Sequence, residues 1–176
     1  ILTITAVNAS PVAPTATTTQ SFCSNTSPTV ASLTATGTSI KWYNSAGLTS
    51  VLSSTTSLST GNYYVTQTAS GCESPSFTIS AVVTANPTIT SSTAGSNCGP
   101  GAITLSASAS SGTLNWYAGS LGGTSLGSLT SYTTPSISTT TTYYVEAISN
   151  ACISVSRTAV NATIFAIPSI SSTSPA

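Results

Sequence analysis

The sequence predicts an all-β protein that contains two tandem antiparallel β-sandwiches, and three observations support this class. Apolar residues alternate with Ser and Thr along short stretches, which is the spacing of strands with one buried face. Gly, Pro and Asn separate these stretches at intervals typical of turns. The order Cys, Trp-Tyr, Tyr-Tyr-Val, Cys occurs twice along the chain. Short strands at this density, with no sustained helical spacing, favour a two-sheet sandwich for each copy.

The internal repeat gives the domain boundaries. The Tyr-Tyr-Val segment at residues 63–65 returns at residues 143–145, an offset of 80, and Cys23 returns as Cys98, an offset of 75. The second copy is longer before its Tyr-Tyr-Val segment, where we expect a surface loop. Both flanks match strands of a repeat, so the chain reads as part of a longer array. We predict four segments: the last strand of a preceding repeat (1–7), repeat 1 (8–85), repeat 2 (86–164) and the first strand of a following repeat (165–176).

About seven short strands are expected in each repeat, and the alternation of side chains locates four of them in the first repeat. They cover residues 29–36, 40–43, 63–68 and 77–83, and residues 102–107 are the counterpart of the first strand in the second repeat. In the Trp-Tyr strand, the alternation places the Trp toward the core and the Tyr outward. The predicted core anchors are Trp42, Trp116, Tyr64 and Tyr144, and the predicted outward rings are Tyr43 and Tyr117.

The chain carries only four charged residues, which excludes most catalytic and binding chemistry. They are Lys41, Glu73, Glu146 and Arg157, in 176 residues that include 36 Ser, 35 Thr and no His, Asp or Met. Acid–base catalysis and metal binding need clusters of ionisable groups, and the two glutamates fall at non-equivalent positions of the two repeats. We therefore expect no enzyme activity, no cofactor and no metal site. Without a basic run to neutralise phosphates, we also expect no nucleic-acid partner.

The four cysteines predict disulfides. They contain no C-x2-C element and have no His or Asp beside them, so they are a poor set of metal ligands. Disulfides place the protein outside a reducing cytosol. Four cysteines allow three connectivities, and the repeat symmetry favours Cys23–Cys72 and Cys98–Cys152. Each bond is expected to tie the first loop of a repeat to its last hairpin, at one end of the sandwich.

One segment carries a family resemblance. The run G-N-Y-Y-V-T-Q-T-A-S-G-C-E-S at residues 61–74, together with the Trp-Tyr pair, resembles the immunoglobulin-like repeats of very large secreted surface proteins of Bacteroidetes. These include adhesins associated with gliding motility and type IX secretion. The resemblance covers residues 8–164, and the second copy departs from it at residues 150–153, where Asn-Ala-Cys-Ile replaces Ser-Gly-Cys-Glu. It implies immunoglobulin-like sandwiches in a stalk or adhesive array at the cell surface, and it names no ligand.

The function expected from these features is structural. We expect a segment of an extracellular fibre or stalk of an adhesin, whose partners are neighbouring repeats and surface glycans or other cell-surface polymers, without membrane insertion by this segment. The alternatives are an array of carbohydrate-binding modules and a non-catalytic appendage of a secreted hydrolase. A glycan-binding module should expose coplanar aromatic rings, and Tyr43 and Tyr117 are the candidate ligand contacts. A stalk should bury its aromatic residues.

Overall fold

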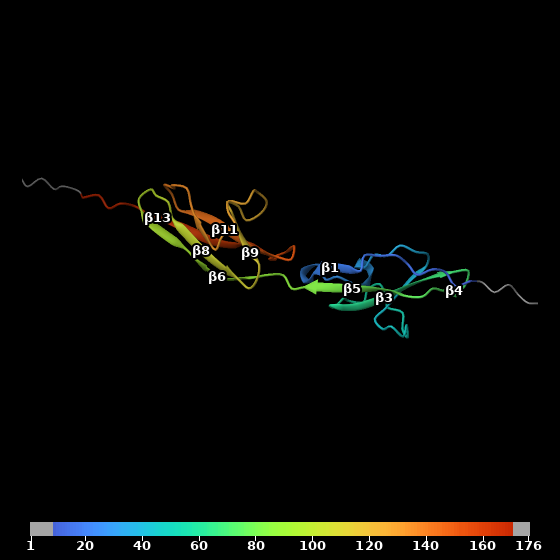
Figure 1. Cartoon of the computed structure of the whole chain (residues 1–176). Helices are drawn as coiled ribbons and strands as arrows, with labels where there is room; N and C mark the ends of the chain where they lie inside the picture. Colours follow the sequence, from blue (N-terminus) through green and yellow to red (C-terminus); the bar gives the residue numbers. More distant parts are fainter. Residues whose placement is uncertain (1–8, 171–176) are drawn as a thin grey trace, which may run out of the picture. The chain divides into compact units, whose positions relative to one another are not determined.

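The computed structural model describes residues 9–170 and divides the chain into two compact units, Ile1–Ala85 and Asn86–Ala176. The regular structure of the described residues is β-strand, apart from two short 3-10 helices (Figure 1). The all-β, immunoglobulin-like fold predicted from the sequence is confirmed. The strand predicted for residues 1–7 lies outside the described residues.

Unit 1 is built on one five-stranded sheet. Its strand order is β1-β5-β3-β2, and β4 pairs with the far end of β3. β1 runs parallel to β5, and the other pairs are antiparallel. The strands predicted at residues 40–43, 63–68 and 77–83 are confirmed. The five strands are β1 (Thr19–Cys23), β2 (Ile40–Tyr43), β3 (Gly61–Ala69), β4 (Cys72–Glu73) and β5 (Phe77–Thr84).

The strand predicted at residues 29–36 is wrong. This segment contains the 3-10 helix η2 (Val30–Ser32), which follows η1 (Ser24–Thr26). A 3-10 turn repeats every three residues, so Val30 and Leu33 are both buried although they differ in parity. The segment is held to β1 by Gln20, whose amide donates to the Thr34 carbonyl oxygen (2.7 Å) and accepts from the Thr34 N–H (2.9 Å).

Unit 2 has a fuller sandwich of two sheets (Figure 1). One sheet has the order β12-β11-β13-β7, with β9 beside β11, and the other has the order β10-β8-β6. The strand predicted at 165–176 is not formed at residues 166–170, and residues 171–176 lie outside the described part. The strands are β6 (Ile89–Thr93), β7 (Gly95–Cys98), β8 (Thr104–Ala109), β9 (Thr113–Tyr117), β10 (Ser131–Thr133), β11 (Thr141–Ser149), β12 (Cys152–Ile153) and β13 (Thr158–Phe165).

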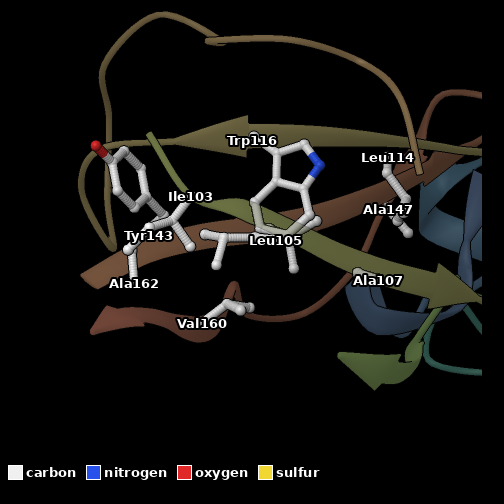
Figure 2. Packing of buried hydrophobic residues seen from close by; sticks show 10 residues of the cluster. Ile103, Leu105, Ala107, Leu114, Trp116, Tyr143, Ala147, Val160 and Ala162 are labelled. Atoms are coloured by element: carbon white, nitrogen blue, oxygen red, sulfur yellow. The ribbon is translucent and has the colours of Figure 1, made fainter. Parts of the chain in front are cut away.

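Trp116 occupies the centre of the core of unit 2. Figure 2 shows its indole over Leu105 of the facing sheet, with Tyr143 to one side and Leu114 to the other. The ring is fully buried, and its Nε1 donates to the Leu129 carbonyl oxygen at 2.9 Å. Because this N–H has a hydrogen-bond partner, the whole ring can be buried without leaving an unpaired polar atom. The prediction that Trp116 is a core anchor is confirmed.

The other predicted anchors need correction. Trp42 is only half-buried and packs at the edge of the core of unit 1. Tyr64 and Tyr144 are half-buried as well, whereas their neighbours Tyr63 and Tyr143 are each 6% exposed and lie in the cores. The reason is strand parity: the first Tyr of each Tyr-Tyr-Val segment shares a face with the fully buried Val two residues later.

The two strand-end hairpins differ at one strained backbone position. In unit 1 the β3–β4 turn is Ser70-Gly71, with φ of 48° and 79°. In unit 2 the β11–β12 turn is Asn150-Ala151, with φ of 49° and 65°. Two consecutive left-handed residues make a type I′ turn, which favours Asn followed by Gly. Ala151 therefore sits where a Cβ is unfavourable.

We expect Ala151→Gly to stabilise unit 2 by about 0.5–1 kcal/mol, because it relieves the left-handed Cβ strain at a modest entropic cost. The matched change, Gly71→Ala, should destabilise unit 1 by a similar amount, since a Cβ there meets open space and only the backbone strain acts. Urea unfolding of both variants measures the two shifts. Equal signs for the two substitutions would contradict this explanation.

The disulfide predicted within the first repeat is wrong, because the two cysteines of unit 1 lie at opposite ends of its sheet. Cys23 ends β1 and lies opposite Thr84, the last residue of β5. Cys72 is in β4, which pairs with β3 beyond the first residue of β5, Phe77. The cysteines are separated by more than the length of β5, roughly 25 Å at about 3.3 Å per residue. A disulfide needs Cα atoms within about 7 Å.

Unit 2 repeats this geometry, so the predicted Cys98–Cys152 bond is also wrong. Cys98 lies opposite Phe165, the last residue of β13, and Cys152 lies beyond the other end of the same strand. Parallel pairing with the last strand carries the first cysteine to the far end of each sheet. Cys23 and Cys152 are each disulfide-bonded, and Cys98 is an exposed thiol. One disulfide inside each repeat is therefore not what the structure contains.

Candidate functional site

The two tyrosines predicted to face outward are buried. Tyr43 is 4% exposed and Tyr117 is 8% exposed, so neither ring offers a surface for stacking a sugar. Both rings lie on the sheet face opposite the Trp, as the alternation predicts. That face is nevertheless covered, because each tyrosine hydroxyl is held by a glutamate. We call the two groups the tyrosine–glutamate clusters and describe them in turn.

In unit 1, the tyrosine–glutamate cluster is centred on Glu73. Oε1 of Glu73 accepts from the Tyr43 hydroxyl at 2.7 Å and from the Thr66 hydroxyl at 2.5 Å. Its other oxygen, Oε2, lies 3.1 Å from Nζ of Lys41. The register of β2 with β3 places Lys41 opposite Thr66, so both face the hairpin that carries the glutamate. Each carboxylate oxygen therefore has a partner.

These contacts favour the charged form of Glu73. The Thr66 hydroxyl bond lowers its pKa most, the Tyr43 bond comes next and the Lys41 ammonium adds to them, which brings the pKa from 4.5 to about 2. Burial raises the pKa of Tyr43, and its bond to the Glu73 carboxylate raises it further. Both groups are consequently held in fixed charge states across the neutral range.

We expect unit 1 to lose stability as the pH falls from about 4.5 toward 2. The folded-state pKa of Glu73 lies below its unfolded value, so the unfolded chain binds the proton first and the stabilisation present above pH 4.5 disappears. Urea midpoints measured through Trp42 fluorescence in a Trp116→Phe background follow this unit alone. In Glu73→Gln, the stability of unit 1 should fall less between pH 4.5 and pH 2. An unchanged loss of stability in that variant would show that another group controls it.

In unit 2, the tyrosine–glutamate cluster uses a glutamate from a different strand. Glu146 is in β11, at the position that Thr66 occupies in unit 1. Its Oε1 accepts from the Tyr117 hydroxyl at 2.6 Å, and its Oε2 lies 3.0 Å from Nε of Arg157. The Arg157 guanidinium also stacks on the ring, with Cζ 3.3 Å from the Tyr117 centroid. The bond to Glu146 is the main reason that the pKa of Tyr117 is raised.

Arg157 also organises the extra loop of the second repeat. Its Nη1 donates to the carbonyl oxygens of Gly119 and Gly122, at 2.8 Å and 2.7 Å. A guanidinium can bind a carboxylate and two carbonyls at once because its donors are fixed in one plane. The insertion predicted to be a surface loop is therefore tied to the sheet by one largely buried cation.

The two clusters perform the same structural task from non-equivalent positions. Glu73 and Glu146 do not align, as the repeat register predicts, but the sequence did not reveal that each pairs with a cation and binds the tyrosine after the Trp. The signal that could have revealed the cluster was the pairing of the Trp-Tyr strand with the Tyr-Tyr-Val strand, which places Lys41 opposite Thr66. Each cluster has one carboxylate with both oxygens occupied, so it does not provide the carboxylate pair that acid–base hydrolysis uses.

Other candidate catalytic, small-molecule or metal sites on the described residues are weak. A hollow of about 410 Å³ in unit 2 is lined by two leucines and by small or hydroxyl-bearing residues, namely Ser108, Ala109, Gly112, Thr113, Leu114, Ser128, Leu129 and Thr130. Within residues 9–170, no three His, Cys, Asp or Glu side chains gather as a metal site would require. No helix in the same range is long and apolar enough to cross a membrane.

Fold and clusters together define a pair of immunoglobulin-like β-sandwiches, a class that is typically non-catalytic. The family model described as "Ig-like domain CHU_C associated" matches residues 11–87 and again residues 84–165. The chain therefore belongs to this family of immunoglobulin-like domains. No curated protein matches it.

The solved structures that match this chain share little sequence with it. Fibronectin(III)-like modules of Clostridium thermocellum CbhA are 20% identical, with a TM-score of 0.39 over 73% of this chain and 78% of theirs. Murine CEACAM1b is 14% identical, with a TM-score of 0.38 over 72% and 85%. The Ig1-2 module of the Drosophila receptor protein tyrosine phosphatase DLAR is 13% identical, with a TM-score of 0.35 over 86% and 95%.

Proposed function

We propose that the two units are structural repeats of an extracellular fibre or stalk, part of a cell-surface adhesin of the kind used in gliding motility. The observation that supports the proposal is the position of the aromatic side chains, none of which offers an exposed ring among residues 9–170. No Trp or Tyr among residues 9–170 is exposed, and Tyr43 and Tyr117 bind glutamates inside their own unit. Aromatic platforms are the usual means of holding a neutral sugar, so the lack of a fully exposed Trp or Tyr ring among these residues favours a spacer over a carbohydrate-binding module.

Two further features support an extracellular location. Cys23 and Cys152 are disulfide-bonded, and disulfides persist in oxidising compartments. The surface is dominated by hydroxyl groups, and the four charged side chains are paired as Lys41 with Glu73 and Arg157 with Glu146. A surface of this kind depends little on the ionic strength of its surroundings, which suits an exposed filament.

A replacement experiment in the parent protein tests the proposal. Two immunoglobulin-like repeats of equal length and unrelated sequence replace residues 8–164, and adhesion of the cells is measured. A spacer can be exchanged, so we expect adhesion to persist and to fall only when the two repeats are deleted without replacement. Loss of adhesion in the exchanged protein, together with binding of the purified chain to a glycan array, would support the carbohydrate-binding alternative instead.

A further inference from the structure

Trp116 of unit 2 uses both of its N–H groups. Its backbone N–H points away from β11, toward the free side of β9, and donates to the carbonyl oxygen of Gly127 at 2.9 Å. Its Nε1 donates to the carbonyl oxygen of Leu129, also at 2.9 Å. Tyr132 stacks on the indole, with the ring centroids 5.8 Å apart. One stretch of chain, residues 127–132, therefore supplies two acceptors and an aromatic cover, and the hollow of unit 2 does not reach Trp116.

Trp42 has the same place in unit 1 without these partners. It lies opposite Val65 of β3, as Trp116 lies opposite Val145 of β11, so its backbone N–H also points to the free side of its strand. β2 is the last strand of its sheet on that side. In the described part of the chain, neither N–H group of Trp42 has a hydrogen-bond acceptor. Its Nε1 is open to solvent, since the one buried side-chain polar atom without a partner in that part is Oγ1 of Thr68.

The covering stretch is shorter in unit 1. In both units a leucine N–H donates to the carbonyl oxygen of the Trp, from Leu52 at 2.8 Å and from Leu126 at 2.7 Å. In both units the chain then reaches the layer that faces this sheet, where the carbonyl oxygens of Ser54 and Thr130 accept from a backbone N–H at 3.0 Å and 2.9 Å. One residue lies between these two points in unit 1, and three residues lie between them in unit 2. The loop of unit 1 is therefore two residues too short to follow the same path.

The shorter loop removes both the acceptors and the ring. Ser53, the residue that remains between the two points, directs its carbonyl oxygen to the Thr56 N–H at 3.0 Å and not to the Trp. Thr56 stands where unit 2 has Tyr132, as the pairing of the next residue in each unit shows. An exposed threonine therefore replaces the stacked ring, and the indole of unit 1 is only half-buried.

The uncovered edge of β2 borders a hollow of about 260 Å³. Trp42 lines it from the strand, and Val51 and Leu52 line it from the loop, where Val51 is 54% exposed. Lys41 also lines the hollow, but its ammonium is paired with Glu73 at 3.1 Å and offers no free charge. The volume is below the roughly 300–1,000 Å³ of sites for drug-sized ligands. The hollow therefore suits a short, uncharged piece of extended chain.

We propose that the edge of β2 and its hollow dock a short, uncharged, extended segment of a protein partner. The segment presents two backbone carbonyls two residues apart and an aromatic side chain three residues after the second, as residues 127–132 do in unit 2. Trp42 then donates both of its N–H groups to the carbonyls, and the partner's ring lies on the indole. Addition of an extended segment to a free sheet edge is a general mode of peptide recognition. The site does not depend on the role of the array as a stalk.

A titration with the covering stretch of unit 2 tests the proposal. The probe is residues 127–132 as a free peptide, Gly-Ser-Leu-Thr-Ser-Tyr, acetylated and amidated so that it carries no charge. Two-dimensional NMR of the ¹⁵N-labelled chain follows the indole and backbone N–H signals of Trp42, and Trp116→Phe assigns them. We expect both Trp42 signals to move and to saturate, whereas those of Trp116 stay in place because its N–H groups are already bonded. A peptide with Ala in place of Tyr should bind about tenfold more weakly.

Three results of this titration would overturn the proposal. Trp42 signals that the peptide leaves in place would show that the edge does not take an extended segment. A larger response of these signals to a neutral oligosaccharide such as cellohexaose would make the occupant a glycan. Movement of the same signals when the concentration of the chain alone is raised would make the occupant a second copy of this chain.

A loop graft gives a second measurement. Replacement of Ser53 by Gly-Ser-Leu restores the loop length of unit 2 and should bring the chain's own carbonyls onto Trp42. We expect the affinity for the peptide to fall at least about tenfold, and the Trp42 signals of the free graft to lie where the peptide moves them in the unaltered chain. The matched control places the same three residues at Gly47, which is exposed, and leaves the edge open. Undiminished peptide binding in a graft whose Trp42 signals have moved would contradict the proposal, and the titration of the unaltered chain decides if the graft does not fold.

Discussion

Replacing Trp116 by Ala is expected to destabilise unit 2 by about 3–5 kcal/mol, the largest effect of any single substitution considered. The ring is fully buried between two sheets, so its removal leaves a cavity that the strands cannot close. It also leaves the Leu129 carbonyl without its donor. A unit of this size has a total stability on the order of 5–10 kcal/mol, so much of it should be lost.

Denaturant unfolding of the intact chain measures this effect. In Trp116→Ala, far-UV circular dichroism follows both units, and the fluorescence of Trp42 follows unit 1 alone. The matched control is Trp42→Ala, which should cost clearly less because that ring is half-buried at the edge of its core. Equal losses for the two substitutions would contradict the assignment of Trp116 as the central anchor.

The second large effect is expected at the cluster of unit 2, where Glu146→Ala should cost about 3 kcal/mol. The side chains of Arg157 and Glu146 are only 11% and 12% exposed, so the substitution leaves a largely buried cation without its carboxylate. It also leaves the Tyr117 hydroxyl without its acceptor. Urea unfolding in a Trp42→Phe background, followed by Trp116 fluorescence, measures unit 2 separately.

Two comparisons sharpen this test. Lys41→Ala breaks the corresponding pair in unit 1, whose side chains are 38% and 34% exposed, and should cost no more than about 1 kcal/mol. The double variant Glu146→Thr with Ile153→Glu moves the carboxylate to the position it has in unit 1. It should regain part of the stability lost in Glu146→Thr alone. No recovery would show that the two clusters are not interchangeable.

Local patterns in the sequence predicted some of the strands of both units. Alternation located β2, β3 and β5, and the repeated Tyr-Tyr-Val segment located β11, since each depends on a two-residue period within one stretch of backbone. The same reasoning failed at Val30 and Leu33, because a buried 3-10 turn and a short buried strand look alike without their neighbours. Parity within the Tyr-Tyr-Val segment would have selected Tyr63 over Tyr64.

The clusters show why face assignment is not the same as exposure. Alternation correctly put Tyr43 and Trp42 on opposite faces of β2, yet the tyrosine is the more buried of the two. A hairpin 30 residues away in sequence covers the tyrosine with Glu73. What covers a sheet face is decided by segments distant in the chain, and no local pattern encodes it.

By itself, then, the sequence determined the all-β class, the duplication and the small number of charged residues, which excludes most catalytic chemistry. Only the tertiary structure decided where the cysteines lie. Matching positions in two repeats suggested a bond within each, but the parallel pairing of β1 with β5 carries Cys23 to the end of the sheet opposite Cys72. The physical reason is that strand direction and register are long-range properties, set by which strands pair and not by the residues of any one strand.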